Sequence, residues 1–125
     1  MLPPEARPGK IVKIIKDKLA FNELKPMASR IFENMVKAVV DIDRDLIALD
    51  AELHSDLEAL LLQEGSKQDN LWGINLYPEL SGEEFIEFDS MINIRPSQRN
   101  RSRGVENEAV RGKITAVVQK RISSR

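Results

Sequence analysis

Residues 36–53 read VKAVVDIDRDLIALDAEL, and their apolar pattern gives the first indication of the fold. Apolar side chains occupy every second position along 36–42 and again along 45–53, which is the period of a strand with one buried face. The stretch therefore predicts two neighbouring strands joined by a short turn.

The length of the turn between these strands follows from the requirement that both apolar sets lie on the same side of the sheet. A two-residue turn at 43–44 places Val40 opposite Ile47 and Lys37 opposite Asp50, and it keeps both apolar sets on one side of the sheet. A three-residue loop would shift the register by one residue and mix the two faces. We therefore predict an antiparallel hairpin with a two-residue turn.

Helix signals flank this hairpin. Asn22 is a residue type that caps helices, and it precedes a stretch with helical apolar spacing that runs to about residue 33. Pro26 is tolerated only near a helix start, so the alternative is a first turn that begins at Lys25. Ser55 followed by Glu58 reads as a capping box, and Gly65 stands where a helix end favours positive φ. Further elements follow from the same patterns: strands at 10–15, 71–77 and 84–94, and a last helix at 107–122.

The predicted order is thus β-α-β-β-α-β-β-α. It indicates an α+β fold, with a mainly antiparallel sheet of four to five strands and helices on one face. A chain of 125 residues has the usual size of one domain. We expect a single domain over 10–125 and, because of its three prolines, a flexible tail over 1–9.

Composition excludes several classes of function. The chain has no cysteine and one histidine, which excludes disulfides, thiolate catalysis and a multi-histidine metal site within one chain. No apolar run approaches the roughly 20 residues that span a bilayer, and MLPPEARPGK lacks the apolar stretch of a secretory signal. We expect a cytoplasmic protein without membrane attachment, cofactor or bound metal.

Charge divides the chain into two parts. Residues 95–125 carry a net charge of +7, and residues 1–94 carry −8. Such asymmetry favours a directional electrostatic surface, unless folding brings the two parts together.

Arginines are concentrated in NIRPSQRNRSRG, residues 93–104. The guanidinium group pairs well with phosphate oxygens, so this loop, 95–103, is the predicted binding element for a phosphate-bearing or acidic partner, nucleic acid included. The alternative is that the arginines neutralise the protein's own acids. The predicted ligand-binding residues are Arg95, Gln98, Arg99, Arg101 and Arg103.

A second candidate site lies on the sheet. If helices cover the apolar face, the opposite face presents polar residues: Lys37, Asp41, Asp50, Glu52, Glu87, Asp89, Asn93 and Arg95. This face is interpreted either as solvated or as the floor of an acid-base or metal-assisted hydrolase. The catalytic candidates on this face are Glu52, His54 and Asp89, with capping or packing as the alternative role for His54.

Two blocks of sequence carry a resemblance. ELHSDLEALLLQEGSKQDNLWGINLYPE (52–79) and EFDSMINIRPSQRNRSRGVENEAVRGKI (87–114) look like a family of small prokaryotic proteins catalogued as a domain of unknown function. The resemblance runs from about residue 11 to 122. It implies a soluble, stand-alone prokaryotic domain and supplies no catalytic residue.

Three functional hypotheses remain open. The first is a binding module that uses the arginine loop 95–103. The second is the hydrolase on the polar sheet face. The third is a structural partner protein from an operon-encoded pair, in which the loop docks on another protein's acids. Self-association through the strand 84–94 is a further hypothesis, on the condition that this strand lies at a sheet edge.

Overall fold

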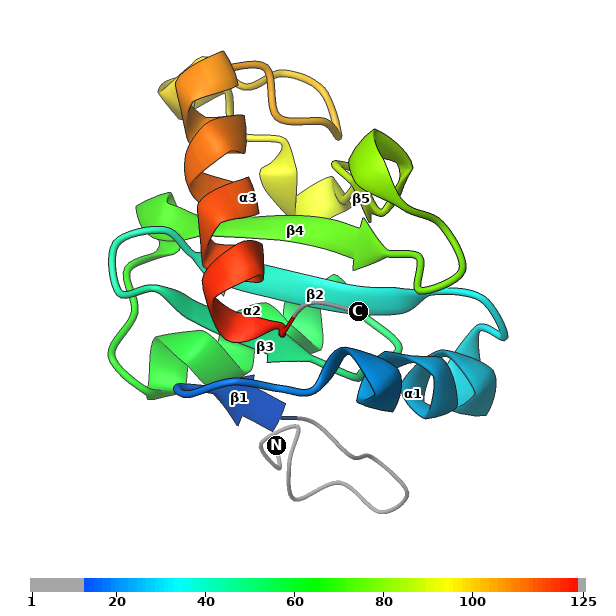
Figure 1. Cartoon of the computed structure of the whole chain (residues 1–125). Helices are drawn as coiled ribbons and strands as arrows, with labels where there is room; N and C mark the ends of the chain where they lie inside the picture. The colour runs from blue at the N-terminus through cyan, green and yellow to red at the C-terminus, as the bar shows by residue number, and fades with distance from the viewer. Residues whose placement is uncertain (1–12, 124–125) are drawn as a thin grey trace.

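The computed structural model describes residues 13–123. The predicted tail 1–9 and the start of the predicted strand 10–15 lie outside this range and stay predictions. The elements occur in the predicted order (Figure 1): β1 Lys13–Ile15, α1 Leu24–Ile31, β2 Val36–Asp41, β3 Leu46–Leu49, α2 His54–Gln63, β4 Leu71–Leu76, β5 Ile86–Glu87 and α3 Glu108–Arg121. The α+β fold is confirmed.

The five strands form one sheet in the order β1-β3-β2-β4-β5, and every neighbouring pair is antiparallel. The hairpin of β2 and β3 has the predicted register, with Val40 opposite Ile47. Beyond the ladder, the Asp50 N–H donates to the Lys37 carbonyl at 3.3 Å, which places that pair opposite each other as well. Residues 42–45 make the turn, with the predicted 43–44 at its centre.

Helices cover both faces of this sheet, so the prediction of helices on one face is wrong. One core cluster joins α1 and α3 to the face that carries Ala38 and Val40. A second cluster joins α2 to the opposite face, which carries Val39 and Ala48. The reason lies in β3, whose LIAL sequence is apolar and buried at all four positions, as in strands that are covered on both sides.

The predicted polar face is therefore a second core at the centre of the sheet. Its polar residues lie toward the ends of the strands, around that core. Asp50 illustrates the boundary, because it ends β3 with a left-handed φ of 77° and its buried carboxylate accepts a hydrogen bond from Arg30. The strand predicted over 45–53 ends at Leu49 for this reason.

The strand predicted over 84–94 is reduced to β5. Past Glu87 the chain leaves the ladder and forms a short 3-10 turn, Met91–Asn93. The remaining strand does lie at a sheet edge, but its two residues offer little backbone for pairing with a second copy. Self-association stays a prediction.

Both predicted N-terminal caps are wrong, whereas the helix ends are better placed. Asn22 lies inside a 3-10 turn, Phe21–Glu23, that leads into α1. The cap of α2 is Leu53, so Ser55 lies within the helix and makes no capping box. Gly65 has the expected positive φ, at 98°.

The two ends of the described chain are held together next to α3. Leu19 and Ile122 form a parallel bridge, in which Leu19 N–H donates to the Arg121 carbonyl at 2.7 Å and Ser123 N–H donates to the Leu19 carbonyl at 2.9 Å. The Phe21 N–H adds a 3.1 Å bond to the Ser123 hydroxyl.

Within residues 13–123, no helix combines the length and the apolar composition that a membrane span requires.

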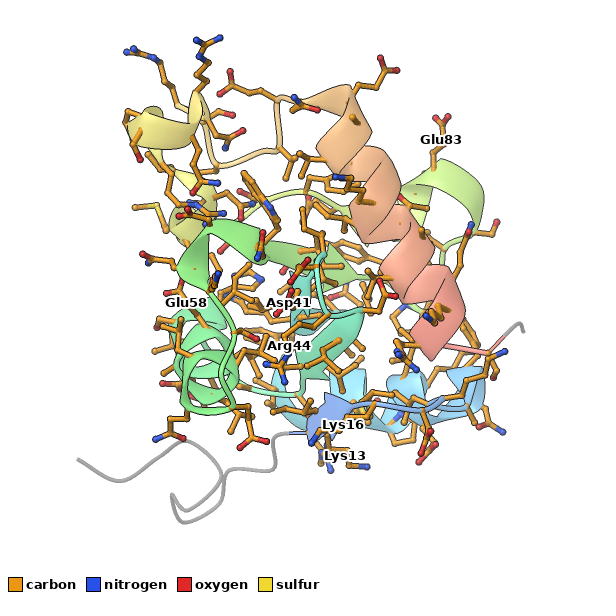
Figure 2. All side chains as sticks on the ribbon, turned by 90° about the vertical axis from the view of Figure 1, so that its left-hand side faces the viewer. Lys13, Lys16, Asp41, Arg44, Glu58 and Glu83 are labelled. Atoms are coloured by element: carbon orange, nitrogen blue, oxygen red, sulfur yellow. The ribbon has the colours of Figure 1, made fainter. Side chains whose placement is uncertain are left out.

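The turn of the central hairpin depends on Asp41. Its Oδ1 accepts the N–H groups of Asp43 at 2.9 Å and Arg44 at 3.0 Å, and the side chain is fully buried. Figure 2 shows Asp41 and Arg44 close together at the end of the hairpin. A short acceptor at this position closes the turn from within.

We predict that Asp41→Ala lowers the free energy of unfolding by about 1–3 kcal/mol, because two turn N–H groups lose their acceptor. Urea denaturation followed by circular dichroism measures this. Asp43→Ala, a change of the same type at an exposed position of the same turn, should stay within about 0.5 kcal/mol of the parent. Equal effects of the two changes would contradict this role of Asp41.

Candidate functional site

The segment that follows β5 is organised by a buried asparagine, Asn93. Its side-chain Oδ1 accepts the Gly73 N–H at 2.8 Å, and its Nδ2 donates to the Gly73 carbonyl and the Arg103 carbonyl, both at 2.9 Å. The amide thus pairs with β4 as a neighbouring strand would, at the point where β5 has ended. It ties residues 91–103 to the sheet.

A second buried asparagine, Asn100, holds the arginine loop from inside. Its Nδ2 donates to the carbonyls of Asn93 and Gly104, both at 2.7 Å, and its Oδ1 accepts the Glu106 N–H at 2.8 Å. The Glu106 carboxylate in turn accepts two main-chain N–H groups of the loop, those of Arg101 at 2.7 Å and Ser102 at 2.9 Å. These bonds lower the pKa of Glu106 and fix the course of the loop.

Two of the predicted ligand-binding residues hold the loop in place. Arg95 donates to the carbonyls of Gln68 and Leu71, and its guanidinium lies 4.2 Å from the centre of the Trp72 ring. Burial lowers the pKa of Arg95. Gln98 donates to the Asp69 carbonyl at 3.0 Å. Both side chains are used within the fold.

The other three arginines face solvent. Arg99 has a left-handed φ of 60° at the end of the 3-10 turn Pro96–Gln98, and among residues 13–123 neither Arg99 nor Arg101 forms a salt bridge. Arg103 differs, because its Nε donates to Asp89 Oδ1 at 2.6 Å. Nitrogen-tipped side chains extend outward from this yellow segment in Figure 2.

A small pocket lies between the N-terminus of α2 and the segment 90–103. Its volume is about 150 Å³. We call it the His54 pocket, and its lining is Lys37, Leu53, His54, Ser55, Ser90, Met91, Ile92 and Arg103. Two cationic side chains and two hydroxyls line it, and no carboxylate does.

His54 forms the inner wall of this pocket. Its Nε2 lies 2.8 Å from the Ile74 carbonyl, so the proton of the neutral ring resides on Nε2. Burial lowers the pKa of His54 from its ordinary value near 6.5, and the neighbouring Lys37 lowers it further, while the carbonyl bond and Asp89 act in the opposite direction. The ring is neutral at pH 7.

The predicted catalytic candidates are only partly brought together. His54 and Asp89 lie on the same side of the molecule, and the Asp89 carboxylate is bound by Arg103. Glu52 is exposed and lies outside the pocket lining. Within residues 13–123, no three histidine, aspartate or glutamate side chains are arranged to hold a metal ion.

Sequence reasoning missed the residues that shape this region, among them Gly73 and Ser90. A Cβ on Gly73 would lie 2.5 Å from Ser90 Cβ and 3.2 Å from His54 Cδ2, so only glycine lets the two segments meet over β4. A glycine within a strand is one available signal of such close approach. The other is Asn93, an amide placed between two isoleucines.

The fold and this site define a small α+β domain with a polar pocket at the margin of its sheet. The model of a family described as a protein of unknown function, DUF5674, matches residues 13–121, and the chain belongs to that family. The resemblance seen in the two sequence blocks is thereby confirmed. No curated protein and no solved structure matches the chain.

We predict that Gly73→Ala lowers the free energy of unfolding by about 1–3 kcal/mol, the usual penalty of overpacking a buried contact. Gly112→Ala is the matched control. Gly112 lies within α3 and its added methyl would meet nothing within 4 Å, so the change should raise stability by about 0.5–1 kcal/mol. Thermal unfolding of both variants shows whether each one is less or more stable than the parent. A Gly73→Ala variant as stable as the parent would contradict the close contact.

Stability should also depend on pH through His54. Well above pH 6.5 the histidine is neutral in both states. As the pH falls through 6.5, the unfolded chain binds a proton that the folded chain, with its lowered pKa, binds less readily. The free energy of unfolding should therefore fall as pH decreases from about 7 to 5. The His54→Gln variant should show a smaller decrease, and identical pH profiles for variant and parent would contradict the lowered pKa.

Proposed function

We propose that the protein binds a phosphate-bearing ligand in the His54 pocket, and that Arg99 and Arg101 contact further anionic groups of the same ligand. The observation that carries this proposal is the lining of the pocket. It includes Lys37 and Arg103 and excludes every carboxylate, although the surrounding chain is rich in acids.

The groups in the pocket suit an anion. Lys37 forms no salt bridge among the described residues; its ammonium lies 5.3 Å from the centre of the Phe32 ring. Arg103 is oriented by the bond from its Nε to Asp89, and the N–H groups of its two terminal nitrogens are left for a ligand. The first turn of α2 adds a favourable backbone dipole at the same place. A pocket of about 150 Å³ favours a single phosphate group over a larger anion.

The arginine loop supplies the second half of the surface. Asn100 and Glu106 hold its backbone, so Arg99 and Arg101 are displayed from a fixed loop. A preorganised loop loses less entropy when a ligand binds. Two like charges so close together also repel each other, and a phosphate-bearing ligand relieves this cost.

The hydrolase hypothesis has less support from the same geometry. The His54 ring is engaged by the Ile74 carbonyl through Nε2 and by a hydrogen bond with the Asn75 side chain, so it is poorly placed for proton transfer. Of the two carboxylates proposed with it, Glu52 is outside the pocket and Asp89 is neutralised by Arg103. Binding without turnover is the function that we favour.

Fluorescence anisotropy of short single-stranded RNA, with either a 5′-phosphate or a 5′-hydroxyl end, tests the proposal. The parent should prefer the 5′-phosphate, and Lys37→Gln should reduce that preference about tenfold, as the loss of one charged hydrogen bond would. Arg99→Ala with Arg101→Ala should weaken both RNAs and lower the salt slope by about 1.4, since each phosphate contact contributes roughly 0.7.

The control variant, Lys18→Ala with Lys113→Ala, removes the same charge from exposed positions outside the pocket lining and the arginine loop. It should leave both the preference and the slope nearly unchanged. Equal weakening by the control would reduce the effect to net charge, and an absence of binding at low salt would exclude the RNA. The acidic protein partner would then be the hypothesis to test next.

A further inference from the structure

A groove runs along the other face of the sheet, between α3 and the segment that carries β5. Two hollows of about 520 and 730 Å³ make it up. Both are lined by Gly82, Ile86, Thr115 and Gln119, so the two are continuous. Figure 1 shows α3 crossing the sheet with the β5 segment beside it.

The floor of the groove is part of the core that the helices leave uncovered. Phe85, Ile86 and Phe88 pack against the cluster under α3, yet they remain only partly buried. They form one continuous apolar strip along the β5 segment. A strip of this kind that lies beside a helix gains free energy when another apolar surface covers it.

The rim of the groove is acidic at its hollow of about 730 Å³. Glu83 and Glu108 line it from opposite sides, both are exposed, and neither forms a salt bridge among residues 13–123. Figure 2 shows Glu83 extending outward beside α3. The cation in the lining, Arg111, donates to the carbonyls of Val105 and Glu106, so it is turned toward the loop.

The floor also presents backbone groups that face away from β4. The Tyr77 N–H donates to the Phe85 carbonyl at 2.9 Å, and backbone groups alternate in direction along an antiparallel strand. The N–H and C=O of Ile86 therefore point away from β4, at the outer edge of the sheet. An extended chain laid along β5 reaches this pair and the apolar strip at once.

We propose that the groove between α3 and β5 binds an extended peptide segment of a partner protein, in which apolar residues alternate with lysine or arginine. The apolar residues enter the groove, and the basic residues meet Glu83 and Glu108. Alternation follows from the strand geometry, because successive side chains point to opposite sides. This site lies on the opposite face from the His54 pocket and is independent of the function proposed there.

The test uses a fluorescein-labelled heptapeptide of alternating lysine and valine, with a glutamate and valine peptide as the charge-reversed probe. Anisotropy at low salt should show saturable binding of the first probe and none of the second. Gln119→Trp places a large side chain from the exposed face of α3 into both hollows, and it should weaken binding about tenfold or more by excluding the peptide.

Glu83→Gln with Glu108→Gln tests the rim without filling the groove. This variant should weaken binding about fivefold, as two exposed ion pairs would. Glu33→Gln with Glu64→Gln changes the net charge equally at positions outside the groove lining and should bind as the parent does. Circular dichroism of every variant confirms that each one is folded.

Three results would overturn the proposal. The first is the absence of saturable binding of the lysine peptide to the folded parent. The second is equal weakening by the two glutamine pairs. The third is a dimer in sedimentation equilibrium that Gln119→Trp dissociates, because a second copy would then be the occupant of the groove.

Discussion

The central hairpin is buried on both faces, and the positions of the helices follow from this. Every residue of β3 is buried, and β2 places Val39 and Val40 in different clusters on opposite sides. Both faces of such a hairpin are apolar, and exposing either face to water costs free energy, so each face requires helices that cover it. Because α2 follows the hairpin directly, it covers one face, and α1 and α3 cover the other.

The candidate site follows from where this cover ends. Near β4, α2 begins with His54. Past the end of β5, the segment 91–103 takes the place of a strand beside β4. Asn93 makes this possible, since its one side-chain amide satisfies both backbone groups of Gly73. The loop is thereby free to carry exposed arginines while its backbone stays paired.

Much of the fold could be predicted from local patterns, and the site could not. The hairpin register and the residues of α3 depend on periodicity within a few residues, which the sequence displays. The two-sided cover could not be predicted in this way, because the alternation in 45–53 predicts one buried face, although Leu46 and Ala48 between those positions are apolar and lie on the other face. For Arg95, composition predicts a ligand contact but does not reveal that its guanidinium also donates to the carbonyls of Gln68 and Leu71. Likewise, the alternation in 84–94 predicted a strand, but Asn93 offers β4 a side-chain partner in its place.

The bridge between Leu19 and Ile122 has a kinetic consequence. Together with the hydrogen bond from Phe21 to Ser123, its hydrogen bonds close a loop about a hundred residues long. The chain loses the entropy of that closure before the contact contributes favourable free energy. The hairpin of β2 and β3 closes over a few residues and forms at far lower entropic cost. We therefore expect the hairpin to form first and the bridge between Leu19 and Ile122 to form last. Folding is then complete only when segments from both ends of the described chain have met.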